Sequence, residues 1–380
     1  MNGRERKLAC SFRAALAAVL CCLTIPAPTQ AREVVDSGAV HKALADAAVA
    51  SEAQRIDALA DRQATDALVG ALEQLPRIQA KGTIAHEWLL DRGLHALAKV
   101  KPTPSARTLL QRIAQEQPQI FVRVDPDHGP HAVPLYDPGA TARFVLKTWE
   151  RTAAREQTAA ALLANQTWPI ERFAQGEAGE DPITSGIVDA FRAADASLLA
   201  RQRDALAAAL RNGERVDELA AIAAEKLRDG ELYEQVLSAA EPVVALDALK
   251  HARTALGDSR ALDALIVASR RPPIASAALI EIGAIAREDS RARAYLFETL
   301  RDASAGPSAA TALASLHDPA VIADLGRQLR ANTPDVARRH MALALKLEGS
   351  TGSRAQLEQF LATRAGSAKL QKEVRAWLAQ

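Results

Sequence analysis

The C-terminal part of this 380-residue chain repeats one pattern of apolar side chains with a period close to thirty residues. Four leucine anchors lie 31, 29 and 32 residues apart, and an apolar pair follows each anchor. The anchors are Leu265, Leu296, Leu325 and Leu357, and the pairs are Ile282/Ile285, Leu313/Leu316, Leu343/Leu347 and Val374/Leu378. Two amphipathic segments in each period are typical of an α-solenoid, in which helical hairpins stack side by side.

The composition favours helices throughout the chain. Hydrophobic residues make up 48% of the sequence but aromatic residues only 4%, so the apolar content comes mainly from alanine and leucine. Alanine, leucine, arginine and glutamate have high helix propensity, whereas the residues that favour strands are sparse. We therefore predict an all-α fold, an α-solenoid of stacked helical hairpins, with one small irregular or β-hairpin insertion near residues 119–140.

The first 31 residues have the three parts of a secretory signal peptide. A basic start is followed by an apolar run, Ala14 to Pro26, which is too short to cross a bilayer. Small residues before Ala31 predict cleavage after that residue. We expect a periplasmic or secreted protein with no membrane insertion after cleavage. An uncleaved membrane anchor is the weaker interpretation, because the run is short and ends in a proline.

Removal of residues 1–31 changes both the cysteine content and the charge. All three cysteines, Cys10, Cys21 and Cys22, would be lost, so the mature chain has no disulfide, no cysteine nucleophile and no thiolate ligand. Four of 47 basic residues and one of 46 acidic residues would also go, which leaves a net charge of −2. Such a near-neutral protein gives no reason to expect nucleic acid as a partner.

The mature chain is predicted to have four parts. They are an N-terminal helical block (32–118), a proline-rich insertion (119–140), a helical block with long helices (141–230) and the repeat array (231–380). In the third part we expect a long helix over 141–165, an exposed loop over 166–184, and helices over 186–211 and 214–228. Asp229-Gly230 is expected to stop the last of these.

The insertion is the one place where the sequence predicts strands. Ile120 to Val124 is rich in β-branched and aromatic residues, and Ala132 to Tyr136 can pair with it across a short loop. Pro134 would keep the second strand at an edge of the sheet.

Proline, aspartate and glycine mark the expected helix ends in the array. Second helices are expected to start near Pro242, Pro273, Pro307, Pro334 and Ser367. Asp318-Pro319 supplies a cap and a first-turn proline for a first helix. Gly257 and Gly349 are placed to end second helices.

The segment Pro307 to Leu329 resembles the bacterial HEAT-like repeat. It has paired alanines, leucines on consecutive turns, an Asp-Pro turn and a second leucine-spaced helix. His317 stands where the family usually has a glycine, and the hairpin over 320–349 lacks the Asp-Pro exit. The resemblance covers about residues 232–380, and less surely 58–115. It implies a protein-binding scaffold, although some members are enzymes that modify bound chromophores.

Known catalytic motifs are absent from the sequence. His86-Glu87 opens a zincin-like motif, but Leu90 occupies the position of the second histidine. His86, Asp91 and His95 do not share a helical face well. There is no Gly-x-Ser-x-Gly elbow, Walker loop or Gly-x-Gly-x-x-Gly motif, so we expect no catalytic residue and no cofactor.

One group of possible metal ligands lies in the insertion. Asp125, Asp127, His128 and His131 occur in a short loop with two prolines, and carboxylates with imidazoles are suitable ligands for Zn²⁺. An exposed turn in which aspartates cap backbone amides is the simpler interpretation, and we prefer it.

Other exposed-looking residues are given ordinary structural roles. Trp88, Trp149, Trp168 and Trp377 are expected in packing positions, with Trp168 the best candidate for an exposed contact.

Arg327, Arg330, Arg338 and Arg339 could form a basic stripe, but Asp324 and Asp335 interrupt it, which favours a solvated helical face.

Two functions follow from these observations. The first is a non-catalytic exported scaffold that binds a protein or peptide along the groove formed by the second helices. The second is a metal-binding or enzymatic accessory protein with a site around Asp125–His131. The sequence leaves the oligomeric state open.

The preferred interpretation of the insertion loop predicts that Zn²⁺ does not bind there. Titration of the purified protein with Zn²⁺ in a calorimeter should then give no heat of binding. Heat that disappears in the His131→Ala variant would instead establish the metal site.

Overall fold

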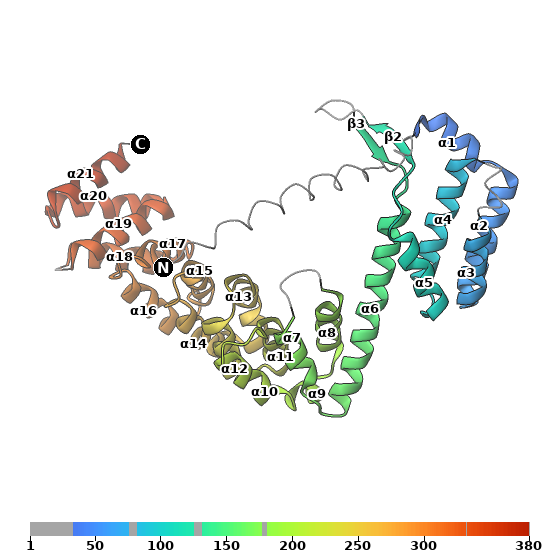
Figure 1. The fold of residues 1–380 in the computed structure, drawn as a ribbon. Helices are drawn as coiled ribbons and strands as arrows, with labels where there is room; N and C mark the ends of the chain where they lie inside the picture. Colours follow the sequence, from blue (N-terminus) through green and yellow to red (C-terminus); the bar gives the residue numbers. More distant parts are fainter. Residues whose placement is uncertain (1–32, 76–81, 125–130, 177–180, 332, 380) are drawn as a thin grey trace, which may run out of the picture. The chain divides into compact units, whose positions relative to one another are not determined.

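A computed structural model describes residues 33–75, 82–124, 131–176, 181–331 and 333–379 (Figure 1). These residues contain 21 helices and one three-stranded sheet, which confirms the predicted all-α fold. They form two compact units that divide at Trp149/Glu150, within a long helix. The predicted signal peptide and its cleavage site lie outside the described residues. No helix of the described residues is long and apolar enough to cross a membrane.

The N-terminal unit is built from helices that share one core. They are α1 (Ser37–Leu44), α2 (Ala47–Asp61), α3 (Thr65–Gln74), α4 (Thr83–Leu97), α5 (Pro104–Ile113) and the first part of α6 (Pro138–Leu163). Helix α2 packs on α4, and α3 packs on α5. Fully buried aliphatic side chains such as Ile56, Leu89 and Leu110 fill the core, and the ring of Trp149 closes it.

The sheet of this unit has the order β1-β2-β3. The strands are β1 (Glu33–Val35), β2 (Ile120–Val124) and β3 (His131–Pro134). Strand β2 pairs antiparallel with β3, with Val122 opposite Val133, so the predicted hairpin is confirmed. Strand β1 pairs parallel with β2, with Glu33 opposite Ile120, and the sequence analysis did not predict this pairing.

The C-terminal unit contains the second part of α6 and fifteen further helices among its described residues. They are α7 (Trp168–Ala174), α8 (Pro182–Ala193), α9 (Ala196–Ala200), α10 (Arg203–Arg211), α11 (Asp217–Leu227), α12 (Gly230–Ala239), α13 (Pro242–Leu256), α14 (Asp258–Ala268), α15 (Ala275–Ile285), α16 (Ser290–Thr299), α17 (Gly306–Ala314), α18 (Pro319–Arg330), α19 (Asp335–Glu348), α20 (Thr351–Thr363) and α21 (Ala368–Leu378).

Two predictions about residues 166–211 were wrong. Helix α7 occupies part of the expected loop, because Pro169 fixes its first turn. The single helix expected over 186–211 is three helices, α8, α9 and α10. Ala194 leaves the helical region with a ψ of 147°, which ends α8 without glycine or proline.

Most helix ends of the array lie where the sequence places them. Pro242 begins α13, Pro307 lies in the first turn of α17, and Asp318 accepts a hydrogen bond from the backbone N–H of Ala320 at 2.8 Å. Gly349 ends α19 in the left-handed conformation. The helix end predicted at Asp229-Gly230 was wrong in detail. Arg228 takes the left-handed conformation at the end of α11, and Asp229 caps the start of α12.

The helices from α10 onwards lie in two rows. Helices α12, α14 and α16 follow one row in Figure 1, and α13, α15 and α17 follow the other. In the second row α11 packs on α13, α13 on α15, α15 on α17, and α17 on α19. We call α12, α14, α16, α18 and α20 the first helices, and α13, α15, α17, α19 and α21 the second helices.

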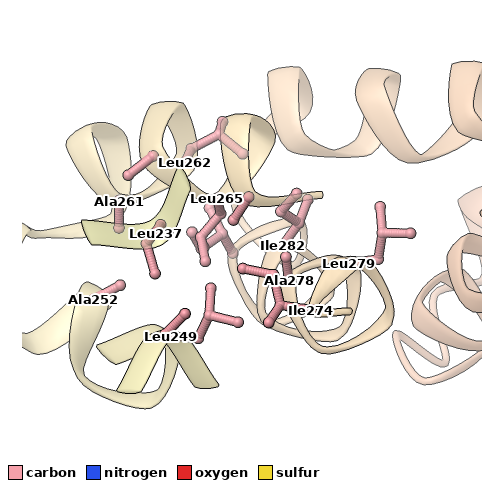
Figure 2. Packing of buried hydrophobic residues seen from close by; sticks show 14 of the residues in the cluster. Leu237, Leu249, Ala252, Ala261, Leu262, Leu265, Ile274, Ala278, Leu279 and Ile282 are labelled. Atoms are coloured by element: carbon pink, nitrogen blue, oxygen red, sulfur yellow. The ribbon is translucent and has the colours of Figure 1, made fainter. Parts of the chain in front are cut away.

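One continuous core fills the space between the rows. All four leucine anchors are at most 3% exposed. Figure 2 shows Leu249 of α13, Leu265 of α14 and Ile282 of α15 meeting in this core, with Ala252, Ala261 and Ala278 beside them. Leu347 was expected to pack as part of an apolar pair, but it is exposed. The buried stripe of α19 runs instead through Ala337, Met341 and Leu345, at helical spacing.

Small residues allow close approach between neighbouring helices. A Cβ atom added at Gly186 of α8 would lie 2.3 Å from the carbonyl oxygen of Arg151 and 2.8 Å from the Cβ of Ala154, both on α6. A Cβ atom at Gly283 of α15 would lie 3.0 Å from that of Ala312 on α17. These helices therefore pack at distances that larger side chains would not permit.

Basic side chains that come later in the sequence cap the carbonyl ends of earlier helices. Lys226 of α11 donates to the oxygen of Ala194 after α8, at 2.8 Å. Arg271 donates to Leu237 and Ala240 at the end of α12, and Nδ1 of the buried His340 lies 2.9 Å from the oxygen of Leu300 after α16. These contacts pair carbonyl groups that a helix end leaves without an intrahelical donor.

Glu348, the last residue of α19, joins the start of α20 to the turn between α17 and α18. Its carboxylate accepts hydrogen bonds from the backbone N–H of Ser350 at 3.0 Å and from the hydroxyl of Ser353, and Nδ1 of His317 lies 3.3 Å away. Burial pushes the pKa of Glu348 upward, but the bonds from Ser350, Ser353 and His317 outweigh it and lower the pKa to about 2.

The Gly186→Ala variant should be destabilised, because its new methyl group meets backbone atoms of α6 that cannot rotate away. We expect a loss of about 1–3 kcal/mol, measured as a lower denaturation midpoint in circular dichroism. Gly230→Ala is the matched control, since no atom lies within 4 Å of its added Cβ and its effect should be within about 0.5 kcal/mol. Equal effects of both substitutions would contradict the close approach.

The Glu348→Gln variant should be less stable than the wild type at neutral pH, and its stability should change less as the pH is lowered. A carboxylate whose folded pKa is lowered adds stability above the unfolded pKa, near 4.5, and loses it as the pH falls toward 2. Its contribution at pH 7 is about 1–3 kcal/mol. Urea denaturation of variant and wild type at pH 7, 4.5 and 3 measures this difference. Glu358→Gln, at an exposed position of α20, is the control, and a difference that does not shrink below pH 4.5 would contradict the assignment.

Candidate functional site

The predicted metal loop lies mostly outside the described residues. Asp125, Asp127 and His128 are among the residues not described, and His131 is described only as part of the backbone of β3. Elsewhere in the described ranges, no group of three or more histidine, cysteine, aspartate or glutamate side chains is placed to hold a metal ion. Zinc binding by this loop therefore stays a hypothesis.

In the His86-Glu87 pair, Glu87 has a structural role. Glu87 is 4% exposed, and its carboxylate accepts hydrogen bonds from the backbone N–H groups of Gln119 at 2.7 Å and Ile120 at 3.2 Å. Burial raises the pKa of Glu87, although these two bonds oppose the change. Burial also lowers the pKa of His86. The carboxylate thus fixes α4 to the start of β2, a role that the sequence analysis missed.

Asp91 and His95 form a separate local arrangement. Asp91 accepts a hydrogen bond from the hydroxyl of Thr141 at 2.7 Å, and Nδ1 of His95 lies 3.5 Å from its carboxylate. His86 takes no part in these contacts. The structure therefore does not bring the three residues into one site.

The arginines of the possible basic stripe already have partners. Arg327 pairs with Asp324 and Arg338 with Asp335, which are the interrupting aspartates of the sequence. The remaining contacts are Arg330 with Gln356 at 2.7 Å and Arg339 with Glu373 at 2.9 Å. Arg327 and Arg339 are exposed, as expected of a solvated face, whereas the side chain of Arg338 is only 13% exposed and also donates to the backbone oxygen of Ala331 at 2.7 Å.

The tryptophans take packing positions. Trp149 is 3% exposed, whereas Trp88, Trp168 and Trp377 are half-buried. Arg92, Arg107 and Lys346 lie over the rings of Trp88, Trp149 and Trp377, respectively, at 5.5, 5.8 and 4.8 Å from the ring centres. Trp168, the candidate for an exposed contact, begins α7 with part of its ring covered.

Exposed aliphatic side chains gather on the second helices. Among the described residues of the C-terminal unit, five large apolar side chains are exposed, and four of them lie on α13, α15 and α19. These four are Val243, Ile280, Val336 and Leu347, with exposures of 77%, 53%, 43% and 51%. No first helix carries such a residue in the described ranges. We call these four residues the second-helix face.

The second-helix face adjoins a groove between α11 and α13. The groove has a volume of about 600 Å³, and its apolar lining includes Ile222 of α11 with Val243 and Leu246 of α13. Below it, the buried Tyr233 of α12 donates a hydrogen bond to the backbone oxygen of Ala248 at 2.7 Å. The phenol is thereby satisfied inside the protein, and the groove presents mainly aliphatic surface.

Charged residues stand around this groove. Arg192 and Glu218 pair with each other at 2.7 Å. Asp247 lies 3.9 Å from the ammonium group of Lys250 and 4.0 Å from the ring of His251, in contacts that are largely exposed. Glu225, on α11, is exposed and lines the groove.

Two other hollows are more polar. A cleft of about 850 Å³ lies beside the turns that join α14 to α15 and α16 to α17, where the hydroxyls of Ser269 and Tyr295 are 2.6 Å apart. A cavity of about 310 Å³ beside α8 is lined by two ion pairs, Arg151 with Asp189 and Arg192 with Glu218. Arg151 holds the pKa of Asp189 below its usual range. The charged groups of these two ion pairs in the cavity beside α8 are therefore already paired with each other.

The sequence analysis expected binding along the second helices but named no residue there. Val243, Ile280 and Val336 could have been found as aliphatic residues that fall off the stripe of buried positions on their own helices. The shape of the groove, and the position of Glu225 in its lining, depend on how α11 and α13 pack together. No local sequence pattern shows this packing.

Comparisons with known proteins find no relative of this chain. No protein-family model, no curated protein sequence and no solved structure matches this chain.

Proposed function

We propose that residues 231–380 form a HEAT-like α-solenoid, and that the protein is a non-catalytic scaffold whose second-helix face binds a polypeptide partner. The observation that carries this proposal is the one-sided distribution of exposed aliphatic side chains. Four lie on second helices and none on first helices within the described ranges. Exposed apolar residues confined to one of two rows of helices are consistent with an interaction surface.

The packing of the second helices supports an extended binding surface. Because α11, α13, α15, α17 and α19 each contact the next in the series, a partner lying across them meets several helices in turn. Repeat proteins use such a row for polypeptide binding, since each helix adds a small contact and the sum is specific. Each aliphatic side chain that becomes fully covered contributes about 1–2 kcal/mol.

We further propose that the scaffold works outside the cytoplasm, as a periplasmic or secreted protein. The support is the arrangement of residues 1–31, together with the restriction of all three cysteines to that segment. A chain without cysteines after cleavage relies on packing alone, and the continuous core of the C-terminal unit is consistent with that.

Site-specific crosslinking tests the binding face. A photoreactive benzoylphenylalanine placed at 243, 280 or 336 in the native cells should capture the same partner from each position. The matched positions 294 and 323 are exposed alanines on the first helices α16 and α18, and they should capture nothing in common with that set. A partner captured only from 294 and 323 would contradict the proposal.

The double variant Val243→Asp/Ile280→Asp gives a quantitative test with the captured partner. Two charges on the binding face should weaken the purified complex by about tenfold or more. The melting temperature should change little, because both side chains are exposed in the free protein. Ala294→Asp/Ala323→Asp is the control, and equal affinities for the two double variants would disprove the assignment of the face.

A further inference from the structure

Two carboxylates line the groove between α11 and α13. Glu225 extends from α11 and Asp247 from α13, and both line the groove. Burial raises the pKa of the Tyr233 hydroxyl, and the negative charges of Glu225 and Asp247 raise it further. Glu225 therefore lines the groove from α11 and Asp247 from α13.

The charges around the groove do not cancel. Arg192 and Glu218 neutralise each other at 2.7 Å. Lys250 is the other fixed cation, and it lies 3.9 Å from Asp247, with both side chains about 70% exposed. Glu225 has no ion pair with any described residue. One carboxylate is therefore uncompensated, and a second is held only by a loose surface contact.

The surface between these carboxylates is aliphatic. Ile222 and Leu246 are half-buried in the groove, and Val243 is 77% exposed beside them. Lysine and arginine side chains have apolar stems and charged ends, and they commonly lay the stem on apolar surface while the end reaches a polar group. This groove offers both surfaces to one such side chain.

We propose that this groove binds a lysine or arginine, flanked by aliphatic residues, of the polypeptide partner. The proposal rests on the proposed function, because it assigns one subsite on the same binding face. The stem of the basic side chain covers Ile222 and Val243, and its charged end lies between Glu225 and Asp247. Neighbouring aliphatic residues of the partner extend along α13 toward Ile280 of α15.

Other occupants fit the groove less well. An acidic segment would place like charges beside Glu225 and Asp247, which costs affinity. A small polyamine would satisfy the carboxylates but would leave Val243 and Leu246 uncovered. A purely aliphatic segment would bury the carboxylates without a partner for them.

A random dodecapeptide library displayed on phage is the probe, panned on the immobilised full-length protein. The enriched peptides should contain lysine or arginine next to leucine, isoleucine or valine. Parallel panning on the Glu225→Gln/Asp247→Asn variant should lose the basic residues and keep the aliphatic ones. Panning on Val243→Asp should lose both.

Affinities of the enriched peptides give the second readout. In fluorescence anisotropy at low salt, Glu225→Gln/Asp247→Asn should weaken binding by about five- to tenfold, and the difference should shrink at high salt. Glu358→Gln, a carboxylate that pairs with Arg354 on the exposed side of the first helix α20, is the matched control and should leave affinity unchanged. Spermidine should compete only weakly.

The outcomes separate this inference from the proposed function. Aliphatic peptides without basic residues, lost on Val243→Asp, would overturn the basic subsite and keep the binding face. Spermidine that displaces the peptides at equal concentration would overturn a polypeptide occupant of the subsite. Enrichment that Val243→Asp does not change, or no enrichment at all, would overturn both.

Discussion

Close packing between successive second helices is the contact on which the C-terminal unit depends. Its core runs without a break from Leu162 to Val374, and alanines and glycines at the helix contacts keep neighbouring backbones near each other. No cysteine lies between residues 32 and 380, so no covalent link supplements this packing. Neighbouring helices cover one another's apolar sides in this single core.

Polar contacts between hairpins add direction to this packing. Lys226, Arg271 and His340 contact backbone carbonyls at the ends of helices that precede them, and Glu348 gathers donors from turns on either side. Apolar contacts alone would allow neighbouring helices to slide along each other. These hydrogen bonds form only when the helices have one relative position along their axes. The position of the second-helix face, and so of the groove beside α13, follows from this relative position of the helices.

Much of the fold could be predicted from local signals. Pro242, Pro307, Asp318 and Gly349 act within a few residues of themselves, and their helix ends were found. The break after Ala194 was missed because alanine carries no such signal, and β1 was missed because its partner strand lies far along the chain. The binding face was predicted only as a row of helices. Three of its residues, Val243, Ile280 and Val336, fall off the buried stripe of their own helices and could have been found from spacing, whereas the groove depends on how α11 and α13 pack together.

The parallel pairing of β1 with β2 has a consequence for the order in which the chain matures. Glu33 lies opposite Ile120, so the sheet cannot close until the whole intervening stretch has been synthesised. In the second row of helices after α11, contacts instead join near neighbours along the sequence, which favours rapid, stepwise folding. The start of the described chain thus depends on residues far along the sequence, whereas its last helices can assemble one after another from local contacts.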